Sequence, residues 1–156
     1  MESYRSKFER LMAQDAERCG SRVVFGDPVS EADIASLELH FGGQLPQDLC
    51  ELYLEFNGVG HQAPGEGVSW FLVPIDEIPA LSRGVEELLD LHPRVCFFGD
   101  YGNGDSYGYV RPEDGPFLES TLHMWEHETG TLHDSGGTFA EFVDAMVRSM
   151  EEEEGA

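Results

Sequence analysis

The stretch FGDYGNGDSYGY at residues 98–109 decides the fold, because it joins two apolar runs through a turn rich in glycine. The flanking runs, 95–98 and 107–110, are dominated by β-branched and aromatic residues, which favour strands. The glycines between them permit positive φ, and Asn103-Gly104 is the dipeptide typical of type I′ turns. The segment therefore predicts a tightly connected antiparallel hairpin.

Periodic patterns extend the prediction to both sides of this hairpin. Apolar residues at three- and four-residue spacing predict helices over 3–19, between Ser30 and Gly42, from Pro46 to Asn57, and after Thr138. Ser30 with Asp33, and Thr138 with Glu141, have capping-box spacing. We also expect strands at 70–73 and 121–128, a loop at 59–67 and a partly helical stretch at 75–91. Without repeats or linkers, the chain reads as one α+β domain over residues 1–150, followed by a frayed acidic tail at 151–156.

The charge of the chain is large and unevenly placed. Nine Lys and Arg face 31 Asp and Glu among 156 residues, a formal net charge of −22. Five of the basic residues fall within the first 22 positions, so residues 23–156 carry four basic and 27 acidic groups. Nucleic acid and anionic membrane bind through basic patches and are therefore not expected as partners. The acidity suits a highly soluble protein or steering toward a basic protein.

Cysteine usage and the N-terminus point to a reduced, cytoplasmic protein. Cys19, Cys50 and Cys96 are odd in number and contain no C-x-x-C pair. The first residues lack the apolar core of a signal peptide, and no run of about 18 apolar residues occurs.

The glycine-rich segment does not match a nucleotide-binding or calcium-binding loop. Its glycine spacing and the strand expected after it differ from a dinucleotide fingerprint, and it lacks the Gly-Lys-Ser/Thr ending of a P-loop. Asp100, Asn103 and Asp105 offer oxygen ligands, but the spacing and closing glutamate of a calcium loop are missing. A connection between two strands is the simpler interpretation.

The sequence HMWEH at residues 123–127 has the H-x-x-E-H pattern of one class of zinc peptidase. That chemistry needs both histidines on one face of a helix, whereas this segment alternates with period two, as a strand does. In a strand, His123 and His127 would share a face, and His133 could approach across a hairpin. A zinc protein built on these histidines and Glu126 stays an alternative, but we expect half-exposed strand histidines. The sequence predicts no catalytic residue, metal or cofactor.

Three segments in order resemble the SUKH superfamily, which includes bacterial immunity proteins and fungal cell-wall assembly regulators. LPQDLCELYLEFNG at 45–58 is similar to the family's LP-containing helix that closes with Asn-Gly. Residues 98–109 are similar to its glycine-rich hairpin. WEHETG at 125–130 with TFAEF at 138–142 is similar to its Trp-x-His-Glu strand and terminal helix. The resemblance implies helices packed on a mixed, mainly antiparallel, bent sheet, and a non-enzymatic protein that binds other proteins.

Together the resemblance and the charge predict an immunity protein that neutralises a basic, nuclease-like toxin domain by binding it. A regulatory or scaffolding module that binds cellular proteins, as in the fungal branch, is the alternative. Loop 58–67 and segment 76–91 match no family pattern, so specificity is expected there. The candidate contact residues lie mostly in the glycine-rich turn; they are Asp100, Tyr101, Asn103 and Asp105, with Glu66, Trp70, Glu126 and His127 as additional candidates.

Overall fold

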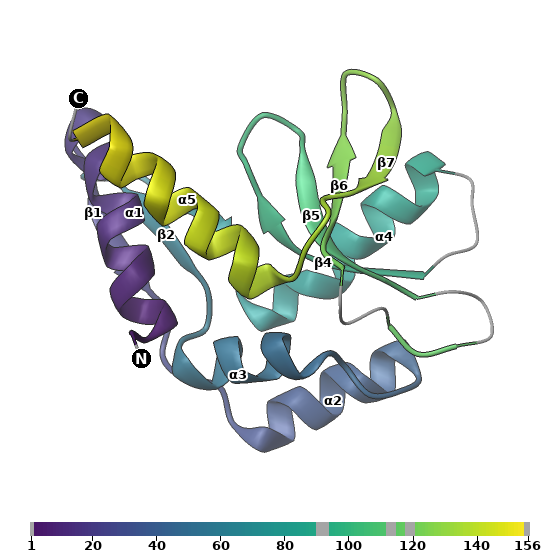
Figure 1. The fold of residues 1–156 in the computed structure, drawn as a ribbon. Helices are drawn as coiled ribbons and strands as arrows, with labels where there is room; N and C mark the ends of the chain where they lie inside the picture. The colour runs from purple at the N-terminus through teal and green to yellow at the C-terminus, as the bar shows by residue number, and fades with distance from the viewer. Residues whose placement is uncertain (1, 90–93, 112–114, 118–120, 155–156) are drawn as a thin grey trace.

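The computed structural model describes residues 2–89, 94–111, 115–117 and 121–154 (Figure 1). The helices are α1 (Tyr4–Arg18), α2 (Glu31–Phe41), α3 (Gln47–Glu55), α4 (Ile78–Leu89) with a preceding 3₁₀ turn, η1 (Ile75–Glu77), and α5 (Phe139–Glu154). The strands are β1 (Arg22–Phe25), β2 (Val59–Gln62), β3 (Ser69–Leu72), β4 (Arg94–Asp100), β5 (Ser106–Arg111), β6 (His123–Glu126) and β7 (Thr131–Asp134). The α+β prediction is confirmed.

The described strands form one seven-stranded sheet in chain order, from β1 to β7. Every neighbouring pair is antiparallel. The expectation of a mixed sheet was therefore wrong, and its mainly antiparallel part is confirmed. The reason is topological. The connections between β1 and β2 and between β3 and β4 contain helices, yet each one re-enters the sheet at the same end of the strands where it left. Parallel neighbours would need a crossover to the opposite end.

Helix ends follow the local signals of the sequence. The backbone N–H of Asp33 donates to the Ser30 hydroxyl and the Ser30 N–H to the Asp33 carboxylate, both at 3.1 Å. Thr138 and Glu141 make the same reciprocal pair at the start of α5. Gly42, with φ of 74°, ends α2 in the left-handed conformation that glycine adopts without strain. Both predicted capping boxes are therefore confirmed.

The sheet has a core on each face. Along β4, Cys96 and Phe98 point into the main core, where α1, α3 and α5 contribute apolar side chains. Val95 and Phe97 point to the other face, into a smaller cluster with Val85 of α4 and other residues. Figure 1 shows α4 and α5 on opposite sides of the central strands. The β4–β5 hairpin is thus packed between two layers of helix.

Aromatic rings dominate the main core. Phe139 at the start of α5 is fully buried and lies 5.5 Å from Tyr4, 6.4 Å from Phe8 and 5.2 Å from Phe98, measured between ring centroids. These contacts join α1, α5 and the sheet. The chain ends are held by side-chain packing rather than by the sheet hydrogen bonds.

The strands that the sequence analysis missed are β1, which pairs with β2, and two segments with a weaker local pattern. Residues 59–62, expected in a loop, form β2, because β1 and β3 both supply backbone partners and Val59 is buried. Residues 131–134 form β7, although three of the four side chains are exposed, because the turn after β6 returns them to pair with it. Backbone pairing outweighs the weak side-chain pattern in both.

The acidic tail also differs from expectation, because α5 continues as a helix to Glu154. Arg10 Nη1 lies 3.0 Å from Glu151 Oε1, and Gln14 Nε2 donates to Glu154 Oε1 at 3.1 Å. Contacts from α1 therefore hold the segment that local propensity leaves to fray. Residues 155–156, and 90–91 of the predicted partly helical stretch, lie outside the described residues. Within the described chain, no helix combines the length and apolarity that crossing a membrane requires.

Candidate functional site

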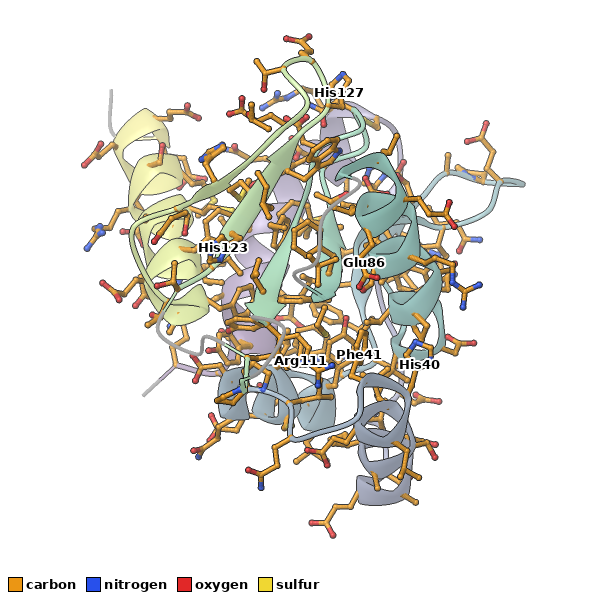
Figure 2. All side chains as sticks on the ribbon, turned by 90° about the vertical axis from the view of Figure 1, so that its right-hand side faces the viewer. His40, Phe41, Glu86, Arg111, His123 and His127 are labelled. Carbon is orange, nitrogen blue, oxygen red and sulfur yellow. The ribbon has the colours of Figure 1, made fainter. Side chains whose placement is uncertain are left out.

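The loop between β4 and β5 lies against the turn between β6 and β7. The His127 backbone N–H donates to Asp105 Oδ1 at 3.0 Å, and His127 Nδ1 lies 2.6 Å from the same oxygen. Figure 2 shows His127 at the end of its hairpin, well away from His123. We call residues 100–105 and 126–130 the hairpin tips. The tertiary structure thus unites Asp105 and His127, which the sequence proposed separately.

The β4–β5 loop is held by its own polar side chains. Asp100 Oδ1 accepts from the Gly102 N–H at 2.7 Å, and Asn103 Oδ1 accepts from the Asp105 N–H at 3.0 Å. The Tyr101 N–H donates to the Asp105 carbonyl at 3.1 Å, which closes a loop longer than the expected two-residue type I′ turn. The tight connection is confirmed, but Asn103 serves as a loop-stabilising residue.

Tyr101 is the exposed aromatic residue of the tips. Its ring packs 5.6 Å from Phe71 and 5.2 Å from Tyr107, yet 38% of the residue stays exposed. Burial, with a smaller effect from Asp105, raises the pKa of the Tyr101 phenol to about 12. The hydroxyl therefore remains a hydrogen-bond donor at neutral pH. A rigid, partly exposed tyrosine with a polar end is well suited to protein recognition.

Glu126 and the histidines do not adopt the zinc-peptidase arrangement. β6 ends at Glu126 and His127 belongs to the turn. The expectation that His123 and His127 share one face of a strand was therefore wrong. His133 does lie across the hairpin, with Nε2 2.9 Å from Glu126 Oε1, but it pairs with Met124 and so faces away from His123. Within residues 2–89, 94–111, 115–117 and 121–154, no three His, Cys, Asp or Glu side chains form a group that could hold a metal ion.

The cysteines are free thiols with different exposures. Cys19 is exposed, Cys50 is half-buried and Cys96 is buried. Burial raises the pKa of the Cys96 thiol well above its ordinary value, which keeps it protonated. Cys96 is thus a core residue, as its apolar sequence context predicts.

A groove of about 330 Å³ lies between α1 and the tip of the β4–β5 hairpin. It brings together three predicted contact residues, Trp70, Asp100 and Tyr101. The sequence analysis missed the residues that complete its lining, half of which belong to helices α1 and α5; they are Leu11, Met12, Asp15, His61, Ser69, Phe71, Gly102 and Met146. We call this the α1 groove. Leu11 and Met12 belong to the apolar spacing that predicts the helix at 3–19, but only packing shows that they border a groove.

Glu66 stands apart from these features. It is exposed in the turn between β2 and β3, where its carbonyl accepts a hydrogen bond from Gln62 Nε2 at 2.7 Å. It is not part of the α1 groove lining. The predicted set therefore divides into the hairpin tips, the groove and this separate turn.

These features define a class of protein before any comparison. An α+β domain presents clustered acidic and aromatic side chains on fixed loops, as a protein-binding module does. The family described as SMI1 / KNR4 family (SUKH-1) matches residues 28–145, and the chain belongs to this family. Its members are in general non-catalytic immunity or regulatory proteins that bind other proteins. A comparison with curated proteins gave no match.

Proposed function

We propose that this chain is an immunity protein that binds a basic, nuclease-like toxin domain through its hairpin tips and blocks that domain without performing chemistry. The observation that carries the proposal is the Asp105–His127 link, which fixes two acidic loops as one surface. Membership of a family with immunity proteins supports it.

The charge of the tips matches such a partner. Asp100, Asp105, Glu126 and Glu128 all belong to the tips, and Tyr101 lies among them as an aromatic anchor. A nuclease binds a polyanion and therefore presents a basic cleft. Carboxylates at fixed positions can occupy that cleft in place of phosphates, and their field accelerates encounter with a basic protein.

Calorimetric titration with the C-terminal domain of the toxin encoded beside this gene, at two salt concentrations, tests the proposal. We expect tight one-to-one binding that weakens as salt rises. The Glu128→Lys variant changes the charge of the tips, and the matched Glu152→Lys variant makes the same change at an exposed site on α5. Only Glu128→Lys should weaken binding, by about tenfold or more.

Equal effects of the two variants would contradict a binding surface at the tips. Tight binding that is insensitive to salt would contradict the electrostatic argument and retain the immunity role. If no binding occurs at either salt concentration, the toxin partner is wrong, and a regulatory module that binds cellular proteins becomes the better interpretation.

A further inference from the structure

The α1 groove joins an apolar floor to two carboxylates. Asp15 comes from α1, one turn after Leu11, and Asp100 comes from the end of β4. The Asp15 side chain is exposed and makes no hydrogen bond or ion pair with any described residue. Asp100 uses Oδ1 to hold the Gly102 N–H at 2.7 Å, which leaves Oδ2 available.

Aromatic and thioether side chains supply much of the rest of the groove, together with Leu11, His61, Ser69 and Gly102. Trp70 and Phe71 are half-buried, Tyr101 is 38% exposed, and Met12 and Met146 complete the apolar lining. No Lys or Arg among the described residues lines the groove. The volume of about 330 Å³ is at the small end for ligand pockets, so it suits one long side chain better than a cofactor.

This combination favours arginine as the occupant. A guanidinium stacks on aromatic rings and pairs with carboxylates in a planar arrangement, while its aliphatic stem packs on apolar surface. A purely apolar side chain would leave both carboxylates without a partner. An acidic side chain would be repelled by them.

We propose that the α1 groove receives an arginine side chain of the partner protein, with its stem against Trp70 and Tyr101 and its guanidinium between Asp15 and Asp100. The proposal rests on the proposed function in one respect, that the partner is a basic protein. The arginine would be a specific anchoring contact beside the acidic hairpin tips. Asp100 and Tyr101 connect the two features, because they belong to the α1 groove and to the tips.

The test is an NMR titration of the whole chain with Nα-acetyl-arginine-methylamide, whose only charge is the guanidinium. The Trp70 indole N–H, assigned by comparison with the Trp70→Phe variant, is the reporter. We expect a saturable shift with a dissociation constant on the order of millimolar. The matching citrulline compound has nearly the same shape without the charge and should bind at least tenfold more weakly.

Variants identify the carboxylates. Asp15→Asn and Asp100→Asn should each weaken arginine binding severalfold, whereas Glu17→Gln, which makes the same charge change at an exposed α1 site outside the groove, should not. Because Asp100 also holds its loop, Asp15→Asn is the decisive variant.

The proposal is overturned if the Trp70 signal shows no saturable shift, if citrulline binds as well as arginine, or if Glu17→Gln weakens binding as much as Asp15→Asn. The titration contains no toxin domain, so its failure is distinct from failure of the proposed function. If arginine binds and no toxin domain does, the groove proposal stands and the immunity role falls. If a toxin domain binds and arginine does not, the immunity role stands and the groove proposal falls.

Discussion

The acidic side chains of α5 and those of the hairpin tips have different partners. On α5, Asp144 pairs with Lys7 at 2.8 Å and Glu151 with Arg10 at 3.0 Å, both from α1. At the tips, the ion-pairing partners of Asp105 and Glu126 are histidines, at 2.6 and 2.9 Å. Lys and Arg carry a fixed charge at neutral pH, whereas histidine is the side chain that titrates near it.

This difference explains the uneven charge of the chain. Four of the five basic residues near the N-terminus lie on α1, which runs beside the acidic α5 (Figure 1). Part of the acidity is therefore compensated inside the fold. Among the described residues, the acidic side chains of the tips form no ion pair with Lys or Arg, and their acidity is the part we propose to serve partner binding. Four predictions test this division.

The largest expected effect is at the aromatic contact between α1 and α5. Phe139→Ala removes a fully buried ring that packs on α1 and on β4, and should lower the free energy of unfolding by about 3–5 kcal/mol. Urea unfolding measures it. Tyr101→Ala, at the partly exposed tip, should cost less than half as much. If both substitutions lower the free energy of unfolding equally, Tyr101 contributes as much to stability as the aromatic contact between α1 and α5.

The second effect concerns the geometry of the tips. Gly104 has φ of +101°, and a Cβ added there would lie 2.8 Å from Cγ of His127. Gly104→Ala should therefore cost about 1–3 kcal/mol and displace the His127 ring. Gly102→Ala, at φ of +82° with nothing within 4 Å of the added Cβ, carries the backbone strain alone. Equal losses of stability, with an unchanged His127 NMR signal, would contradict close packing of the tips.

The third effect is the ion pairing between the helices. The side chain of Lys7 is 16% exposed, and a double-mutant cycle of Lys7→Met and Asp144→Asn should give a coupling of about 0.5–1 kcal/mol that shrinks in high salt. Arg5 and Glu9, a more exposed pair on α1 at 3.6 Å, should couple more weakly. A zero coupling for Lys7 and Asp144 would remove the compensation argument.

The smallest effect is a pH dependence at the tips. Hydrogen bonds from the His127 backbone and side chain hold the pKa of Asp105 below its ordinary value. A lowered folded-state pKa gives stability that is present above the unfolded value, about 3.9, and is lost as pH falls through the folded value. Asp105→Asn should therefore lose most stability near pH 7 and progressively less as pH falls below the unfolded value. A loss of stability for Asp105→Asn that does not change with pH would contradict the assignment.

The sequence predicted features that depend on neighbours along the chain. Ser30 with Asp33 and Thr138 with Glu141 cap their helices over three residues, and the glycine-rich stretch turns between two apolar strands. It failed where a distant partner stabilises a segment of weak local preference. β7 exists through its pairing with β6, and the end of α5 through α1.

The candidate site divides along the same line. The sequence by itself determined that Asp100, Tyr101, Asn103 and Asp105 lie together at the turn between two strands, because turn formation depends on local backbone preferences and hydrogen bonds. Only the tertiary structure decided that His127, 22 residues from Asp105, bonds to it, and that α1 forms one wall of a groove with Trp70. Those contacts join residues far apart in the chain, and their formation depends on how helices and sheet pack rather than on any nearby sequence pattern.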